Sequence, residues 1–218
     1  MVKRIAVLLS NKGTGSNFEA IAEAIDTGKI TNGEIVVVVS NAADAYGLVR
    51  AKKRGIPTII FSLSKYLKTG RSREQYDGEL GILLKKEYRA DLVVLAGWIL
   101  ILTEKFLSYF PKAVINLHPG LLPDGNKRKI KLSTGESIPA IRGLHTDAAV
   151  QYAIDQNFPA TGSSVHFVTA KVDKGKVILR GEVRIKKDDT VDLLYERIKK
   201  VEHKILPQAI EMICRNKI

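Results

Sequence analysis

Two polar side chains follow a short apolar run in the middle of the sequence. Val114 and Ile115 are apolar, whereas Asn116 and His118 stand at alternate positions and Pro119 comes next. Alternate residues of an extended segment point to the same side, and a residue before proline is held extended. An amide beside an imidazole can polarise a carbonyl and hold a developing oxyanion, and the imidazole can transfer a proton near neutral pH. A lone histidine is more often structural, but this pair favours a catalytic role.

A histidine in this role needs a carboxylate that orients it and favours its charged form. Asp173 is the candidate, because it lies in a predicted turn between two late strands and Gly175 allows a close approach there. Composition alone favours an ordinary turn aspartate. From the residues alone, both interpretations stay open.

The segment "SNKGTGSNF" joins the first apolar run to the first predicted helix. Gly13 and Gly15 free the backbone and Ser16-Asn17 opens the helix, so N–H groups and the positive end of the helix dipole could hold a phosphate. Phe18 stands where the dinucleotide fingerprint requires a small residue, which favours a mononucleotide phosphate over NAD. A plain glycine turn with a helix cap fits the segment about equally well.

Apolar runs alternate with helical patterns through the first half of the chain. The runs "RIAVLLS", "EIVVVVS", "IPTIIFS", "DLVVLAGW" and "AVINLHP" have strand length. They are apolar on both faces, which is typical of a parallel sheet covered by helices. We therefore predict an α/β fold: a doubly wound, mostly parallel sheet with helices on both faces and antiparallel strands added in the C-terminal half. Such sheets bind ligands outside the carboxyl ends of their strands, where Asn116 and His118 are predicted to lie.

Helix signals give four local expectations. Asp44 should cap the second helix, and one long amphipathic helix should occupy the region from Ser72 to Tyr88. Thr103 should cap a short helix that reaches Phe110, and Pro207 should kink the last helix.

The chain is expected to form a single domain over residues 1–218, with one inserted segment. From Asp124 to Arg142, two short alternating runs flank "STGE", a pattern typical of an exposed hairpin or ordered loop. We therefore predict an inserted loop or hairpin at about residues 124–142.

Composition limits the classes of partner. The net charge of +12 attracts anions of any kind, but the basic clusters fall in different predicted elements without interleaved aromatic residues. Solvated helix faces explain them better than a nucleic-acid groove does. Cys214 is the only cysteine, no histidine spacing suits a metal, and no apolar run is long enough to span a membrane. We expect small-molecule partners, no nucleic acid, no membrane, no metal and a cytoplasmic location.

A series of motifs resembles one enzyme family over nearly the whole chain. In order, they are "GSN", "SNAADAYGLVRA", "SREQYD", "LVVLAGW", "VINLHPGLLP", "GLHT", "GSSVHFVT", "VDKGKVI" and "EHKILP". Together they resemble the phosphoribosylglycinamide formyltransferases of purine biosynthesis, and the Asn-x-His-Pro core resembles formyltetrahydrofolate-dependent formyltransferases in general. The resemblance implies 10-formyltetrahydrofolate as cosubstrate and a ribonucleotide amine as acceptor.

The resemblance also implies roles for particular residues. Asn116 and His118 would be the catalytic pair, and Asp173 would be the carboxylate that raises the pKa of the histidine. The acceptor's ribonucleotide would contact Gly15, Ser16, Asn17 and Glu202. The folate would contact Arg73, Trp98, Ile99, Leu100, Ile101, Leu102, Asn116, Thr169 and Asp173. Ser164 and His166 would lie on a strand behind the active site.

Several positions depart from the family pattern. Gly120 replaces the usual serine after His-Pro, Lys174 and Lys176 flank the turn after Asp173, and Leu100 stands where arginine is common. The segment 124–142 is much longer than usual and could act as a lid, an oligomer contact or a specificity element. Two other functions stay open: a formyltransferase acting on another amine, such as an amino-sugar nucleotide, and a non-catalytic basic nucleotide-binding module. A homodimer also stays open.

Overall fold

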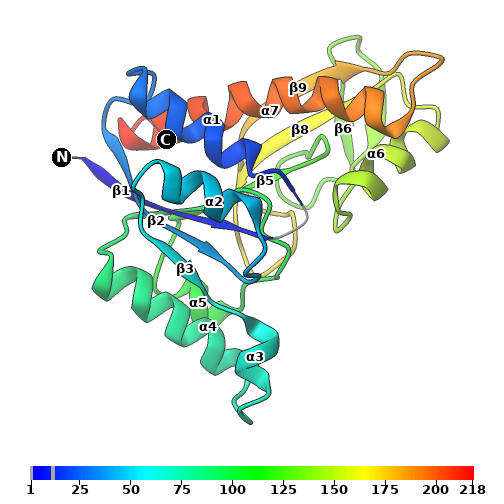
Figure 1. Cartoon of the computed structure of the whole chain (residues 1–218). Helices are drawn as coiled ribbons and strands as arrows, with labels where there is room; N and C mark the ends of the chain where they lie inside the picture. The colour runs from blue at the N-terminus through cyan, green and yellow to red at the C-terminus, as the bar shows by residue number, and fades with distance from the viewer. Residues whose placement is uncertain (1, 11–12) are drawn as a thin grey trace. The chain divides into compact units, whose positions relative to one another are not determined.

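A computed structural model describes residues 2–10 and 13–218 (Figure 1). Asn11 and Lys12, which belong to the predicted phosphate turn, lie outside the described residues. Within the described ranges, no helix is long and apolar enough to cross a membrane.

The main sheet has seven strands in the order β3-β2-β1-β4-β5-β8-β9. β1 pairs in parallel with β2 and β4, β2 pairs in parallel with β3, and β8 pairs antiparallel with β9. The predicted fold class, a mostly parallel sheet with helices and antiparallel strands in the C-terminal half, is confirmed.

The chain divides into two compact units, of which the first comprises Met1–Ile115 and Ile210–Ile218. Its β1 and β2 are almost entirely buried, which explains why their sequences are continuous apolar runs. Its strands are β1 (Lys3–Leu9), β2 (Gly33–Ser40), β3 (Thr58–Ile60) and β4 (Leu92–Leu95). Its helices are α1 (Ser16–Asp26), α2 (Tyr46–Lys53), α3 (Leu63–Leu67), α4 (Arg73–Ile82) with the π-helical turn Leu83–Glu87, and α5 (Glu104–Leu107).

The second unit comprises Asn116–Ala209. Its elements are β6 (Lys129–Lys131), β7 (Ser137–Pro139), α6 (Thr146–Asp155), β8 (Ala160–Phe167) and β9 (Val177–Arg184). Two further elements, β5 (Val114–His118) and α7 (Val191–Cys214), have residues in both units. A single domain over the whole chain stays a prediction.

The helix ends differ in part from the expectations. α2 begins after Ala45 rather than at Asp44, and an alanine side chain cannot cap a helix. The Thr103 hydroxyl precedes α5 but is buried without a hydrogen-bond partner among the described residues, and the helix ends at Leu107. α7 continues past Pro207, although proline supplies no N–H to the helix.

The predicted long helix after Ser72 has two parts. Ser72 and Gln75 form a reciprocal capping box: the Ser72 hydroxyl accepts from the Gln75 N–H at 3.2 Å, and the Gln75 amide oxygen accepts from the Ser72 N–H at 2.7 Å. α4 then changes at Leu83 into a π-helical turn, closed by a bond of 3.3 Å from the Tyr88 N–H to the Leu83 carbonyl. Propensity signals do not distinguish such a turn from an α-helix.

The inserted segment forms the predicted hairpin. β6 and β7 pair antiparallel with Ile130 opposite Ile138, and Gly135 occupies a left-handed position in the turn. Its apolar side chains are buried rather than exposed. They belong to a core cluster that contains Leu121, Leu132, Ile138, Ile141, Ala149, Ala153, Phe158 and Ala160. The hairpin is therefore docked on the core of the second unit.

Candidate functional site

Four polar side chains meet inside the second unit. Asn116 Nδ2 lies 3.3 Å from His166 Nε2, and His166 Nε2 lies 3.5 Å from Asp173 Oδ1. The other oxygen of Asp173, Oδ2, lies 3.4 Å from His118 Nδ1. The structure thus brings together the three predicted catalytic residues, and His166 joins them from β8.

The inserted segment contacts His118, the candidate catalytic histidine, directly. The His118 side chain is buried, and its Nε2 lies 2.7 Å from the Ile141 carbonyl oxygen. Because a carbonyl only accepts, the proton belongs on Nε2, and Nδ1 then faces Asp173. A Cβ atom on Gly120 would lie 3.0 Å from His118 Nε2 and 3.5 Å from Ile141 Cβ. The glycine that replaces the family's serine therefore leaves room for this contact.

The pKa of His118 depends on opposed effects of burial and of neighbouring groups. Burial lowers the pKa of His118 below its ordinary value, and this effect outweighs the negative charge of Asp173 and the bond to Ile141, which raise it. Asp173 acts in the expected sense, but the buried ring is neutral at pH 7.

Asp173 is held in an unusual conformation. Its backbone has φ 51°, in the left-handed region that non-glycine residues rarely occupy. The Gly143 N–H donates to Oδ2 at 2.8 Å. Burial raises the pKa of Asp173, but the interaction with His166, the charge of His118 and the Gly143 N–H together lower it to about 2. The carboxylate is therefore ionised at neutral pH.

The turn after Asp173 requires a glycine two residues later. A Cβ on Gly175 would lie 1.7 Å from the Phe167 carbonyl oxygen. Lys174 and Lys176, which depart from the family pattern, are both exposed. The expected close approach at Gly175 is therefore present, and the two lysines leave it unchanged.

His166 was predicted to lie on a strand behind the active site but was not among the predicted site residues. Its Nδ1 lies 2.9 Å from the Phe167 carbonyl oxygen, so Nδ1 carries the proton and Nε2 can accept from Asn116. The alternation of Ser164 and His166 in "SSVHF" was a signal that both point to one side of β8. The contacts from Ile141 and Gly143 gave no such signal, because they come from backbone groups.

Glu202 occupies a buried position next to the backbone of the catalytic strand. Its side chain is 2% exposed, and Oε1 lies 3.2 Å from the Ser163 hydroxyl. That hydroxyl also lies 2.7 Å from the His118 carbonyl oxygen. A ribonucleotide contact for Glu202 stays a prediction.

The predicted phosphate turn belongs to the first unit. Gly15 precedes α1 with φ 69°, and a Cβ there would lie 2.5 Å from Gly47 Cα. The Arg50 Nε donates to the Thr14 carbonyl at 2.8 Å, so this part of the turn is fixed to α2. Ser16 and Asn17 form the first turn of α1, as expected.

The predicted folate segment, residues 98–102, also belongs to the first unit. The Ile99 N–H donates to the Ser10 hydroxyl at 3.2 Å, and the Arg73 guanidinium donates to the Ile101 carbonyl. Trp98 and Leu102 are buried, whereas the Ile101 side chain is 66% exposed. The Ile101 side chain is therefore accessible to a ligand, whereas the side chains of Trp98 and Leu102 are packed in the protein interior.

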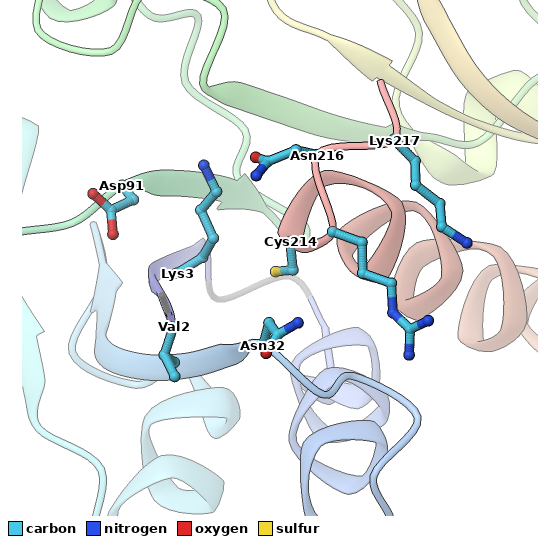
Figure 2. Close-up of a pocket in the computed structure, with 8 residues that line it drawn as sticks. Val2, Lys3, Asn32, Asp91, Cys214, Asn216 and Lys217 are labelled. Atoms are coloured by element: carbon cyan, nitrogen blue, oxygen red, sulfur yellow. The ribbon is translucent and has the colours of Figure 1, made fainter.

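Two other features lie outside this cluster. A hollow of about 570 Å³ lies at the amino ends of β1, β2 and β4, where Figure 2 shows Cys214 among the residues that line it. Burial raises the pKa of the Cys214 thiol to about 11, so it is protonated at neutral pH.

Among the described residues, no three His, Cys, Asp or Glu side chains are arranged to hold a metal ion.

Known proteins resemble the chain over almost its full length. The family model for formyl transferase matches residues 3–210. A phosphoribosylglycinamide formyltransferase from Dictyostelium discoideum is 37% identical over 222 residues, covering 98% of this chain and 98% of that protein. The crystal structure of glycinamide ribonucleotide transformylase 1 from Symbiobacterium toebii superposes with a TM-score of 0.84 at 36% identity, covering 99% of this chain and 89% of that chain.

Some relatives are much longer proteins. The trifunctional purine biosynthetic protein adenosine-3 of Homo sapiens is 35% identical over 213 residues, which cover 97% of this chain but 18% of that protein. The chain thus spans about 18% of the length of such relatives. Both the family model and the relatives nevertheless extend across the candidate catalytic cluster and the predicted phosphate turn. The chain belongs to the formyl transferase family.

Proposed function

We propose that this protein transfers the formyl group of 10-formyltetrahydrofolate to the glycinamide amine of 5'-phosphoribosylglycinamide, a step in the synthesis of IMP. One observation carries the proposal: half-buried Asn116 lies in one cluster with buried His118 and Asp173, in a member of the formyl transferase family. The full-length similarity to a protein named phosphoribosylglycinamide formyltransferase supports this acceptor.

Asn116 and His118 account for the acyl-transfer chemistry. Attack of the acceptor amine on the formyl carbon creates a tetrahedral centre with a negatively charged oxygen. The Asn116 amide has two N–H groups, of which one is directed to His166 and the other can donate to this oxygen. The pair therefore supplies a donor for the oxyanion and a group that exchanges a proton.

The neutral state of His118 determines its role. Because burial lowers its pKa, the imidazole can take up a proton as the attacking amine becomes positively charged. The Asp173 carboxylate, 3.4 Å from Nδ1, then stabilises the imidazolium. As the tetrahedral centre breaks down, the imidazolium is expected to return this proton, through a water molecule, to the nitrogen of the leaving folate.

Substrate binding is assigned by the resemblance to the family. The phosphate is proposed to bind at Gly15, Ser16 and Asn17, with Glu202 contacting the ribonucleotide. The folate is proposed to bind Arg73, residues 98–102, Thr169 and Asp173. The exposed Ile101 side chain and the N-terminus of α1 support these assignments.

The partners follow from this reaction. We expect two anionic small molecules, which suit the net charge of +12, and no metal or nucleic acid. A homodimer and a cytoplasmic location remain expectations.

A product assay tests the proposal. The purified protein is given 10-formyltetrahydrofolate together with 5'-phosphoribosylglycinamide or an amino-sugar nucleotide, and formylated products are identified by mass spectrometry. Formylation of 5'-phosphoribosylglycinamide with the higher kcat/KM supports the proposal. Preferential formylation of the amino sugar would assign the chain another acceptor, and no formylation of either would leave the binding-module interpretation.

A further inference from the structure

The last residues of the inserted hairpin contact both members of the His118–Asp173 pair. The Ile141 carbonyl accepts from His118 Nε2 at 2.7 Å, and the Gly143 N–H donates to Asp173 Oδ2 at 2.8 Å. Arg142 lies between these two contact residues in the sequence. The segment therefore has a part in the catalytic geometry that an exposed loop would not have.

The Arg142 guanidinium joins three backbone segments. Nη1 donates to the Asp173 carbonyl, and Nη2 donates to the carbonyls of Gly125 and Lys127 at 3.0 and 2.9 Å. Gly125 and Lys127 stand at the start of the insert, whereas Arg142 stands at its end. One side chain thus links both ends of the hairpin to the backbone of the catalytic carboxylate.

The hydrogen bond from Arg142 reaches the backbone of Asp173, whose conformation is unusual. Asp173 is left-handed, a conformation that is unfavourable for a non-glycine residue and persists only when its surroundings hold it. A carbonyl bond to a guanidinium is charge-assisted and is therefore stronger than one between neutral groups. Only arginine has the planar arrangement of donors that reaches all three carbonyls at once.

We propose that Arg142 is a positioning residue for catalysis, which holds the Asp173 turn and the closing end of the hairpin so that the carboxylate faces His118. The inserted segment is accordingly a fixed wall of the catalytic cluster. Its buried Leu132, Ile138 and Ile141 anchor it to the core, and Arg142 connects that anchor to Asp173. The catalytic part of this inference rests on the proposed formyl transfer.

The test compares Arg142→Met, Arg142→Lys and the wild type. Methionine keeps an apolar stem but removes every donor, whereas lysine keeps the charge and can bond some of the carbonyls. We expect Arg142→Met to lower kcat by about 10- to 100-fold with both KM values changed by less than about threefold, because misplacement by about 1 Å costs this much. Arg142→Lys should recover part of the lost kcat. Arg128→Met, an exposed arginine of the same insert, should match the wild type.

A second measurement needs no substrate. The titration of His118 is followed by NMR of the histidine-labelled, ligand-free protein. The Asp173 carboxylate raises the pKa of His118 more strongly than the charge of Arg142 lowers it, so a misplaced Asp173 should lower the midpoint in Arg142→Met, whereas Arg128→Met should leave it unchanged. This result would support the placement of Arg142 even if the wild type formylated no acceptor, which would refute the proposed function separately.

Two results would overturn the inference. One is a kcat of folded Arg142→Met within about twofold of the wild type. The other is an unchanged His118 midpoint in Arg142→Met. If Arg142→Met fails to fold, Arg142→Lys decides: a kcat equal to that of the wild type counts against positioning by the three-carbonyl contact, and a partial loss supports it.

Discussion

Asp173 combines three properties that rarely occur together: a buried carboxylate, a left-handed backbone and contacts with two histidines. The carboxylate is expected to act by stabilising the imidazolium of His118 as the proton is transferred. The Gly143 N–H donates to Oδ2, and His166 Nε2 lies 3.5 Å from Oδ1. The negative charge of Asp173 should therefore affect kcat more than the volume of its side chain does.

Asp173→Asn tests this charge. The amide keeps the size of the side chain but cannot stabilise an imidazolium, so we expect kcat to fall by about 10²- to 10⁴-fold. Steady-state kinetics with both substrates measures the effect, and Asp188→Asn, at an exposed aspartate, is the control. A variant that kept at least half of the wild-type kcat would show that the carboxylate has no catalytic part.

The lowered pKa of His118 predicts how stability depends on pH. Because burial puts the pKa of folded His118 below the ordinary 6.5, the unfolded chain binds this proton more readily. The contribution of His118 to the free energy of unfolding should therefore be present above pH 6.5, and it should be lost as the pH falls below 6.5. Asp173, with a pKa of about 2 in the folded protein against an ordinary 3.8, adds a further loss only below about pH 4.

Urea unfolding at pH 7.5, 6.0 and 5.0 measures this dependence. His118→Gln removes the titrating group, so its free energy of unfolding should change less over this interval than that of the wild type. Equal slopes for the two proteins would contradict a lowered pKa of His118.

At the residue scale, the sequence supports only part of the site. Asn116 and His118 were predictable because alternate residues of a strand share a face. The pairing with Asp173 was not predictable from spacing, because a tertiary contact between distant segments joins them, and the family resemblance supplied it. Ile141, Arg142 and Gly143 were not predicted, since two of them act through backbone atoms that carry no side-chain signal.

Among the elements, the turn before α1 depends on one of its two glycines. A Cβ at Gly15 would meet the backbone of Gly47 at 2.5 Å in a left-handed conformation, whereas one at Gly13 would meet no described atom within 4 Å. Gly15→Ala should lower the free energy of unfolding by about 1–3 kcal/mol. It should also raise the KM for the ribonucleotide more than the KM for the folate.

Gly13→Ala is the matched control for this turn. It should change neither the urea midpoint nor either KM. If Gly15→Ala raised only the folate KM, the phosphate assignment would be wrong. If both variants behaved like the wild type, the turn would have no special requirement for glycine.

The hairpin is the second element with a clear energetic role. Ile138 is buried on β7 within the core cluster, so Ile138→Ala should lower the free energy of unfolding by about 2–4 kcal/mol. Lys129→Ala on the exposed face of β6 should change it by less than about 0.5 kcal/mol. Urea unfolding of the two variants tests docking, and equal stabilities would identify the hairpin as a detached loop.

The elements were predictable where a physical pattern is strong. Buried parallel strands require continuous apolar runs, and the hairpin has alternating residues around a glycine turn. The π-helical turn at Leu83 and the start of α2 after Ala45 were missed, because tertiary packing rather than local propensity sets them.

In the whole molecule, the residues proposed for catalysis and those proposed for substrate binding fall largely in different units. The Asn116–Asp173 cluster belongs to the second unit, and the proposed phosphate turn and most of the residues proposed to bind the folate belong to the first. Composition suggested anionic ligands through a net charge of +12, but it could not distinguish them from nucleic acid. Both the catalytic and the substrate-binding assignments depend on the proposal that His118 and its neighbours catalyse the reaction.

The rate of formyl transfer from 10-formyltetrahydrofolate to 5'-phosphoribosylglycinamide tests this claim most directly. We expect the wild type to form product with a kcat of about 1–10³ s⁻¹. His118→Ala should be slower by about 10²- to 10⁴-fold while keeping the wild-type circular dichroism spectrum. No formylated product from the wild type, or a rate for folded His118→Ala within about twofold of it, would contradict the account.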